Sequence, residues 1–298
     1  MRLRRIMAVA LAAMVAFSII GCGSESSKDT KPADKGAVTG SVTGSGSSAL
    51  LPLAKNAADK FKTKNPDVSI TLNGGGSGTG LKQVADGSVD IGNSDVAAET
   101  KLDKTMAASL VDHKVCVITM APVINKELSS TVKSLTKDQL TGIFTAKITN
   151  WKEVGGPDEP IVLITRPQTS GTRALFKQFA LNDQEEASNK SLETDDSGTL
   201  LQSVMDNKGA IGYVALSYLI NNNKVSTLSI DGVAPTLENT YNGTYPVWGY
   251  EHMYTKGEPK GAVKAFLDFI LSDEYGQAME AQGYGISSKV KAKDSASH

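Results

Sequence analysis

The stretch 161–180, IVLITRPQTSGTRALFKQFA, predicts a strand, a polar loop and a helix in that order. Its first four residues are all apolar, which is typical of a short strand that is buried on both faces. In its second half, apolar residues recur at helical spacing, at Ala174, Leu175, Phe176, Phe179 and Ala180. A strand followed by such a helix is the unit of α/β folds with largely parallel sheets.

The same alternation continues on both sides of this stretch. Apolar periodicity predicts further helices near 49–61, 81–85, 199–205 and 263–270. Alternation or short apolar runs predict strands at 68–72, 89–92 and 210–214. The 298 residues, 40% of them hydrophobic, are enough for one large domain or two medium ones. We therefore predict an α/β protein without internal repeats.

The N-terminal residues predict export and a lipid anchor. Three arginines within the first five residues precede an apolar run, 6–20, that is too short to span a bilayer comfortably. The run ends just before Cys22, which resembles the bacterial lipobox, where the signal is cut ahead of a lipidated cysteine. We predict a signal peptide over 1–21, lipidation of Cys22 and a flexible polar tether over 22–37. The alternative is an ordinary signal peptide with an incidental cysteine.

Three loops rich in glycine and hydroxyl residues each lead into a helix: Gly44–Ala49, Gly74–Gly80 and Thr169–Thr172. Glycine lets the backbone approach a ligand closely, and hydroxyls can donate to an oxyanion. The first N–H groups of a helix lack partners and carry about half a positive charge. Each loop alone is best explained as a helix cap. Three of them indicate an anion site if they converge in space.

Two charged residues stand beside these loops. Arg166 ends the strand before the third loop, where a guanidinium can bond two oxygens of an oxyanion. Asp95 follows a strand end, and its carboxylate could accept the proton that phosphate keeps at neutral pH. Fully ionised sulfate would meet that carboxylate with repulsion. The alternatives are a surface salt bridge for Arg166 and a helix cap for Asp95.

Composition and motif spacing argue against several other functions. The formal net charge of −1, without any basic run, argues against nucleic acid as a partner. The glycines of 74–80 match neither G-x-G-x-x-G nor a Walker loop, and no G-x-S-x-G elbow is present. The three histidines and two cysteines lack ligand spacing, so we expect no metal and no cofactor. Cys116 lies in an apolar run and should be a buried, inert thiol.

Six short motifs follow one another along the chain: 44–52 (GSGSSALLP), 76–80 (GSGTG), 89–95 (VDIGNSD), 143–151 (IFTAKITNW), 166–172 (RPQTSGT) and 209–214 (GAIGYV). As an ordered set they resemble the substrate-binding component of the bacterial phosphate ABC transporter, in the periplasmic binding protein superfamily. The resemblance covers about 38–284, nearly the whole chain after the tether. It implies a two-lobed type II fold, in which each lobe is a mostly parallel sheet flanked by helices.

The resemblance also implies where the chain divides. Two hinge strands would cross between the lobes near 119–122 and 246–250. Lobe 1 would consist of 38–119 and 249–298, and lobe 2 of 120–248. The ligand would lie in the cleft between them.

In this family the dehydrated ligand is held by hydroxyls, backbone N–H groups, one arginine and one aspartate. Carried over by motif position, the implied phosphate-binding residues are Ser48, Ala49 (through N–H), Ser77, Asp95, Arg166, Ser170, Gly171 (through N–H) and Thr172. Relatives often have Thr in place of Ser48, which keeps the hydroxyl. Others have an acidic residue in place of Gln168, so Arg166 could be held differently here. Because Ser47 adjoins Ser48, a one-residue slip leaves open which of them contacts the ligand.

The resemblance implies capture without catalysis. Phosphate would be delivered to ABC permease subunits by an extracytoplasmic monomer, held at the cell membrane through lipid on Cys22. Another tetrahedral oxyanion, such as sulfate or molybdate, is an alternative that Asp95 argues against. A phosphatase-like hydrolase would need a base or metal near Ser48 or Ser170, and the sequence indicates neither. A surface adhesin or sensor would not require the paired arginine and aspartate.

Overall fold

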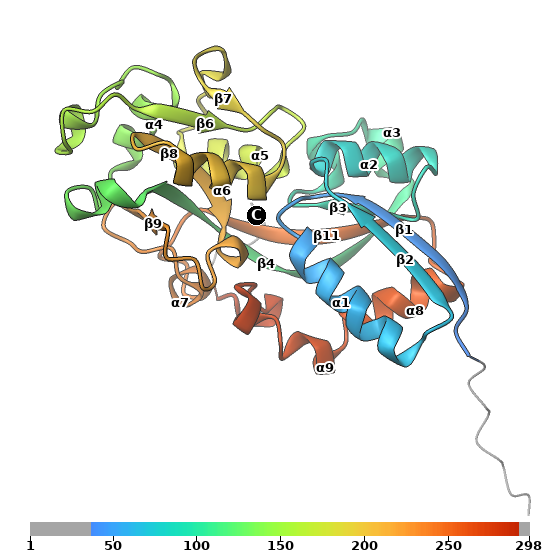
Figure 1. The fold of residues 1–298 in the computed structure, drawn as a ribbon. Coiled ribbons are helices and arrows are strands. Elements are labelled where there is room, and N and C mark those ends of the chain that lie inside the picture. Colours follow the sequence, from blue (N-terminus) through green and yellow to red (C-terminus); the bar gives the residue numbers. More distant parts are fainter. Residues whose placement is uncertain (1–36, 292–298) are drawn as a thin grey trace, which may run out of the picture. The chain divides into compact units, whose positions relative to one another are not determined.

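A mixed nine-stranded sheet forms the centre of the computed structural model, which describes residues 37–291 (Figure 1). The strand order is β2 (Val68–Asn73), β1 (Gly40–Gly46), β3 (Ile91–Ser94), β11 (Trp248–Lys256), β4 (Leu110–Asn125), β8 (Ala210–Ala215), β6 (Val162–Thr165) and β7 (Leu192–Glu193), with β9 (Val225–Thr227) paired to β4. The short strands β5 (Ser134–Leu135) and β10 (Ser229–Ile230) form a separate parallel pair.

Helices alternate with these strands along the chain. They are α1 (Leu51–Lys64), α2 (Ser77–Asp86), α3 (Lys104–Ala107), α4 (Lys137–Phe144), α5 (Gly171–Ala180), α6 (Ser197–Asp206), α7 (Leu237–Tyr241), α8 (Gly261–Ile270) and α9 (Asp273–Gly276). The predicted α/β class is confirmed. The predicted signal peptide, the lipidated Cys22 and the tether up to residue 36 lie outside the described residues.

Strands β4 and β11 give the sheet its mixed character. β1 pairs in parallel with β2 and β3, and β6 pairs in parallel with β7 and β8. β11 runs antiparallel to both β3 and β4. Within β4, Leu110–Thr119 pairs with β11, whereas Met120–Ile124 pairs with β8. One long strand therefore joins the strands around β1 to the strands around β6.

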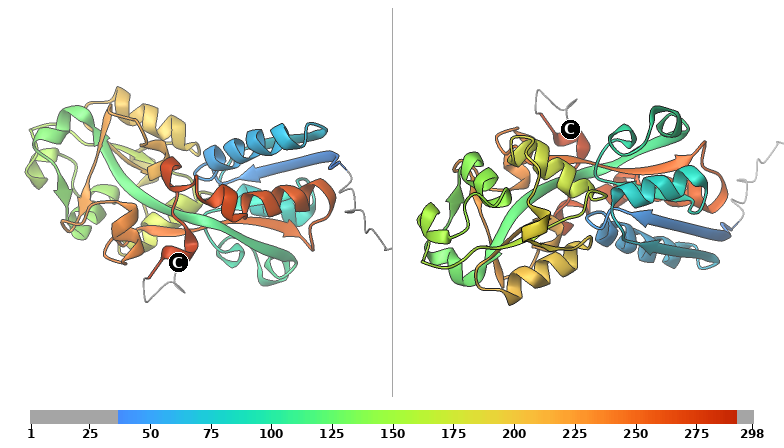
Figure 2. Two further views of the ribbon diagram at one scale, coloured as in Figure 1. Left: turned by 90° about the horizontal axis from the view of Figure 1, so that it is seen from below. Right: turned by 90° about the horizontal axis from the view of Figure 1, so that it is seen from above.

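Helices cover both faces of the sheet around β1 (Figure 2). On one face α1 packs against α8, and the ring centroids of Phe61 and Phe266 lie 5.7 Å apart. On the other face Leu81 of α2 packs with Tyr254 of β11. The preceding residue, Met253, belongs to the core of α1 and α8. Successive side chains of a strand point to opposite faces, which places α2 opposite α1 and α8.

The same alternation occurs at β8. Tyr213 stacks on Phe176 of α5, with ring centroids 4.1 Å apart, and also packs against Phe144 of α4. The next residue, Val214, packs instead in a cluster that contains Leu200 of α6. Helices α4 and α5 therefore lie on one face of this part of the sheet, and α6 lies on the other.

Candidate anion-binding site

The N-terminal turns of α2 and α5 lie against each other. The N–H of Gly78 donates a hydrogen bond of 2.9 Å to the carbonyl oxygen of Thr169. A methyl group on Gly171 would overlap the Ser77 hydroxyl and would lie 2.9 Å from Oδ2 of Asp95. The N–H of Asp95 donates to Ser77 Oγ at 3.0 Å. Two helix N-termini, with their partial positive charge, therefore meet beside one buried carboxyl.

The loop between β1 and α1 brings Ser48 to Arg166. Arg166 directly follows β6, and both residues are at most 2% exposed. The guanidinium Nη2 donates a hydrogen bond of 2.9 Å to Ser48 Oγ, which joins two residues 118 positions apart in the sequence. Ala49 is fully buried next to Ser48. Two predicted site residues from distant motifs are thus in direct contact.

Ser47, the neighbour of Ser48, faces other groups. Its hydroxyl accepts a hydrogen bond of 3.0 Å from the N–H of Leu50 at the start of α1. It also donates to Glu251 Oε1 at 3.5 Å. Of the two adjacent serines, Ser48 is the one that is hydrogen-bonded to Arg166.

Ser170 and Thr172 stand at the start of α5, and each is 1% exposed. Ser170 is the N-cap, because its Oγ accepts from the N–H of Arg173 at 3.2 Å. Its hydroxyl lies 2.8 Å from that of Thr172. The ammonium of Lys101 donates to the carbonyl oxygens of Gln168 and Ser170, at 2.8 and 3.1 Å. The hydrogen bonds of this lysine link the loop before α5 to the segment that follows β3.

Asp195 and Ser197 hold the Arg166 side chain, and sequence reasoning missed both. Arg166 Nη1 donates to Ser197 Oγ at 3.0 Å, and Nη2 donates to the main-chain oxygen of Asp195 at 2.8 Å. Gln168, where relatives can have an acidic residue, donates instead to Glu185 at 3.1 Å. Neutral hydroxyl and carbonyl groups therefore orient the guanidinium.

A signal for Ser197 was present in the sequence. The residues SGT at 197–199 repeat the SGT of 170–172, and each triplet stands at the start of a helix. Ser197 is fully buried, and its Oγ lies 3.0 Å from Ser48 Oγ. A search for repeated helix starts would have found Ser197. A main-chain carbonyl, such as that of Asp195, has no such signal.

Glu251 of β11 is a third residue that sequence reasoning missed. It is fully buried, and its carboxyl lies within hydrogen-bonding reach of the Asp95 carboxyl. Burial raises the pKa of Asp95, while the Ser47 hydroxyl and the Arg166 charge oppose the rise. Burial, followed by the charge of Asp95, raises the pKa of Glu251 well above its ordinary value. The site therefore contains two coupled, buried carboxyls.

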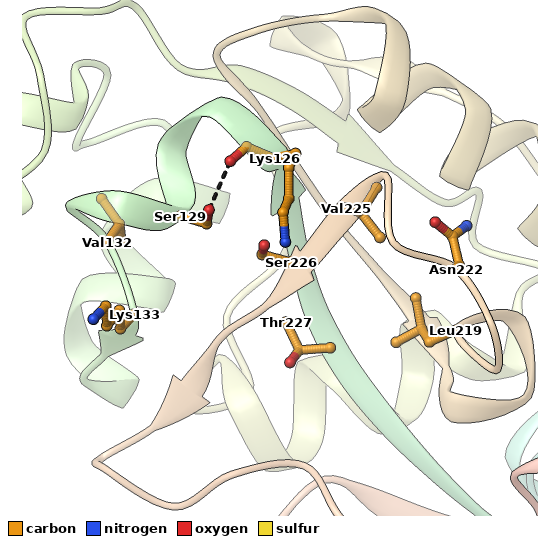
Figure 3. A pocket seen from close by; sticks show the side chains of 9 residues that line it. All are labelled: Lys126, Ser129, Val132, Lys133, Leu219, Asn222, Val225, Ser226 and Thr227. Atoms are coloured by element: carbon orange, nitrogen blue, oxygen red, sulfur yellow. Dashed lines mark hydrogen bonds between the residues drawn. The ribbon is translucent and has the colours of Figure 1, made fainter.

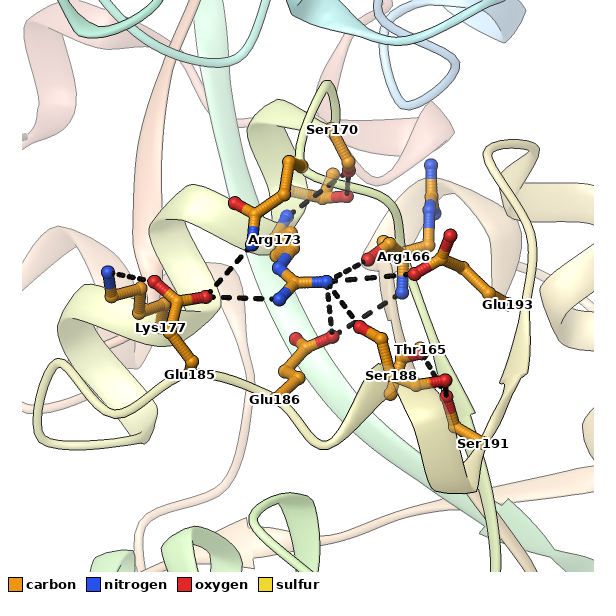
Figure 4. A network of polar contacts seen from close by, with 12 residues as sticks. Thr165, Arg166, Ser170, Arg173, Lys177, Glu185, Glu186, Ser188, Ser191 and Glu193 are labelled. Atoms are coloured by element: carbon orange, nitrogen blue, oxygen red, sulfur yellow. Dashed lines mark hydrogen bonds and ion pairs between the residues drawn. The ribbon is translucent and has the colours of Figure 1, made fainter.

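A buried polar network supports the main chain of Arg166 (Figure 4). Arg173 Nη1 donates to the carbonyl oxygen of Arg166 at 2.5 Å and lies 3.7 Å from Glu186 Oε2. The Tyr213 hydroxyl donates to Glu186 Oε1 at 2.6 Å. Burial is the main reason why the pKa of Glu186 rises to about 7. This network fixes the backbone from which the Arg166 side chain extends.

Within 37–291, no group of three or more His, Cys, Asp or Glu residues could hold a metal ion. Cys116 is buried, as predicted, and burial raises the pKa of its thiol. A surface pocket of about 380 Å³ shares no residue with the site (Figure 3). It is lined by Lys126, Ser129, Val132, Lys133, Leu219, Asn222, Val225, Ser226 and Thr227.

Comparison with known proteins identifies the family. The model of the PBP superfamily domain matches residues 31–274. The phosphate-binding protein PstS of Bacillus subtilis is 48% identical over 278 residues, which cover 91% of this chain and 91% of that protein. The chain belongs to the phosphate-binding proteins of the PBP superfamily. The family predicted from the ordered motifs is confirmed.

Solved structures agree with this family assignment. A Clostridium perfringens protein described as a phosphate ABC transporter substrate-binding protein, with bound phosphate, has a TM-score of 0.75 and 35% identity. The match covers 83% of this chain and 99% of that one. The fold is also shared by an ABC-type phosphate transport receptor from Vibrio cholerae, which is 24% identical to this chain. That match has a TM-score of 0.64 and covers 83% of this chain and 100% of the receptor. In residues 37–291, no helix combines the length and apolar character needed to cross a membrane.

Proposed function

We propose that this chain binds inorganic phosphate among the loops that precede α1, α2 and α5, as the substrate-binding component of a phosphate ABC importer. One observation carries the proposal. Residues from three separate loops and from the ends of β3 and β6 are buried as one set. In it Ser48 contacts Arg166, while Ser77, Asp95 and Gly171 lie together at the starts of α2 and α5. The set consists of Ser48, Ala49, Ser77, Asp95, Arg166, Ser170, Gly171 and Thr172.

The donors of this set suit a dehydrated oxyanion. Hydroxyls, helix N-terminal N–H groups and one guanidinium can surround the four oxygens of phosphate without a large net positive charge. Asp95 supplies the opposite character, a buried acceptor for the proton that phosphate retains. Sulfate has no such proton at neutral pH, so its oxygen would face the carboxylate unscreened.

We further propose that ligand binding closes two lobes, consisting of 38–119 with 249–298 and of 120–248. Strands β4 and β11 would be the hinge. The change of partner in β4, from β11 to β8 after Thr119, supports this division. The Ser48–Arg166 hydrogen bond would link the two lobes. Phosphate would favour the closed state by contacting both lobes at once.

The proposal places the protein outside the cytoplasm, as a monomer without catalytic activity. Lipid on Cys22 would hold it at the membrane, where the closed form would dock on the permease subunits. Its extracytoplasmic location and its permease partner are supported by membership of the phosphate-binding family. Lipidation rests on the lipobox-like sequence that ends at Cys22.

Isothermal titration calorimetry of the chain without residues 1–22 tests the proposal, with phosphate, arsenate, sulfate and molybdate as ligands. We expect saturable 1:1 binding of phosphate, and at least about hundredfold weaker binding of sulfate. Equal binding of phosphate and sulfate would rule out the role given to Asp95. Absence of phosphate binding would overturn the proposed function.

A further inference from the structure

We propose that Glu251 is a positioning residue for the anion site: as the neutral acid it donates a hydrogen bond to Asp95, which leaves Asp95 as the one ionised carboxylate and fixes its free oxygen toward the ligand proton. This inference rests on the proposed function and deepens it. It assigns a role to a residue of β11, outside all three glycine- and hydroxyl-rich loops.

The hydrogen bonding of the two carboxyls carries the inference. Asp95 is 2% exposed and Glu251 is fully buried. The antiparallel pairing of His252 with Ser94 places the two acidic residues opposite each other, with their carboxyls within hydrogen-bonding reach. Each leaves one buried oxygen without a donor, namely Asp95 Oδ1 and Glu251 Oε2. Two ionised carboxylates cannot satisfy each other, because both only accept. One proton held between them supplies the missing hydrogen bond and removes the repulsion of two buried like charges.

The surroundings decide which carboxyl keeps the proton. The Ser47 hydroxyl, followed by the cations Arg166 and Lys101, favours the ionised form of Asp95. Glu251 has the Ser47 hydroxyl as its donor and the Asp95 carboxyl as its charged neighbour. Glu251 also interacts electrostatically with Cys116, Tyr218 and Tyr284, and these three groups are uncharged at neutral pH. The proton therefore belongs on Glu251, and the negative charge belongs on Asp95.

The strand geometry explains how Glu251 reaches the site. The pairing of β11 with β4 shifts register between Glu251 and His252. Such bulges redirect side chains, and they are common beside functional sites. Ser47 contacts both carboxyls, so one hydroxyl connects the first loop to the pair.

Three variants test the inference: Glu251→Gln, Glu251→Leu and the exposed control Glu258→Gln just beyond β11. Glutamine is neutral and can still donate to Asp95, so phosphate affinity should stay within about threefold of the parent. Leucine cannot donate, so affinity should fall roughly tenfold to a hundredfold. The control should match the parent. Phosphate affinity that is unchanged in the folded leucine variant, or lost equally in both Glu251 variants, would overturn the role.

Infrared spectroscopy reports on the proton directly and needs no ligand. The difference spectrum between the parent and Glu251→Gln should contain the C=O band of a protonated carboxylic acid. Its absence would overturn the inference, even if the leucine variant did not fold. Because this readout is independent of phosphate, a parent that shows the band but binds no phosphate would contradict the proposed function, while the shared proton would stand.

Discussion

Asp95 is an unexpected residue in an anion site, because a site that only attracted negative charge would contain no carboxylate. It lies beside the N-termini of two helices, close to Arg166 and buried from water. In such surroundings an ionised carboxylate either repels an anion or accepts its proton. In the proposed site, selectivity for a protonated oxyanion would therefore depend on this one side chain.

We predict that Asp95→Asn relaxes selectivity. The amide removes the charge that repels sulfate, so the ratio of phosphate to sulfate affinity should fall by roughly tenfold or more. Calorimetric titration with both anions measures this ratio. Asp206→Asn, an exposed change at the end of α6, is the matched control and should leave the ratio as it is. A variant that excludes sulfate as well as the parent does would show that Asp95 has another role.

Ser197 should affect binding through Arg166. Its hydroxyl accepts from Arg166 Nη1, so Ser197→Ala would leave a buried guanidinium with one partner fewer. We expect phosphate affinity to fall about tenfold, since hydrogen bonds to charged groups are the stronger ones. Ser203→Ala, on the same helix, should bind phosphate normally. Equal affinity in both variants would mean that Ser197 does not orient the guanidinium.

At the scale of elements, the contact between α2 and α5 has no room for a side chain. Gly171 is the first residue of α5, and a methyl group there would overlap the Ser77 hydroxyl. The two helix starts can meet only because this position is glycine. Substitution should separate them and weaken any ligand that needs both.

We predict that Gly171→Ala lowers phosphate affinity at least about tenfold, and that the overlap also lowers the free energy of unfolding by about 1–3 kcal/mol. The matched control is Gly276→Ala, because an added Cβ there meets no atom within 4 Å. Fluorescence or calorimetric titration of both variants checks the prediction. Full affinity in Gly171→Ala would show that the close approach of α2 and α5 is not needed for binding.

The elements also show what sequence can and cannot reveal. Periodicity located the main helices and several strands, because each has a continuous apolar face. It placed the start of α2 near Leu81 rather than at Ser77, since a run of Ser, Gly and Thr has low helix propensity and becomes helical through packing. Glu251 was missed, because only the pairing of β11 with β3 and β4 brings it near Asp95.

For the whole molecule, Glu186 links stability to pH. Its pKa is about 7 in the folded protein, against an ordinary value of 4.5, because it is buried. The folded state therefore holds this proton more tightly than the unfolded state does. The free energy of unfolding should decrease as pH rises from about 4.5 to about 7, by up to about 3 kcal/mol, and this contribution should then level off.

Glu186→Gln should remove that part of the pH dependence, because its amide cannot ionise. Urea unfolding at several pH values between 5 and 8 would show a smaller decrease in the variant than in the parent. The difference between the two curves isolates Glu186 from the other buried carboxyls. Parallel curves would mean that Glu186 keeps its ordinary pKa in the folded protein.

At the scale of the whole molecule, the proposed phosphate site depends on the convergence of the three glycine- and hydroxyl-rich loops. Ordered motifs indicated which loops take part, but their contacts arise from the sheet. It places β1, β3 and β6 in one layer, with β11, β4 and β8 between β3 and β6. The Asp195 carbonyl can be recognised as a partner of Arg166 only in the folded chain, whereas the repeated SGT triplet is a sequence signal for Ser197.

A crystal structure of the protein grown with phosphate would locate the ligand. We expect one phosphate in contact with Ser48, Ser77, Asp95, Arg166 and Ser170, with a short hydrogen bond to the Asp95 carboxylate. Phosphate that bound only elsewhere, for instance beside Lys126 and Lys133 in the surface pocket of Figure 3, would contradict this expectation.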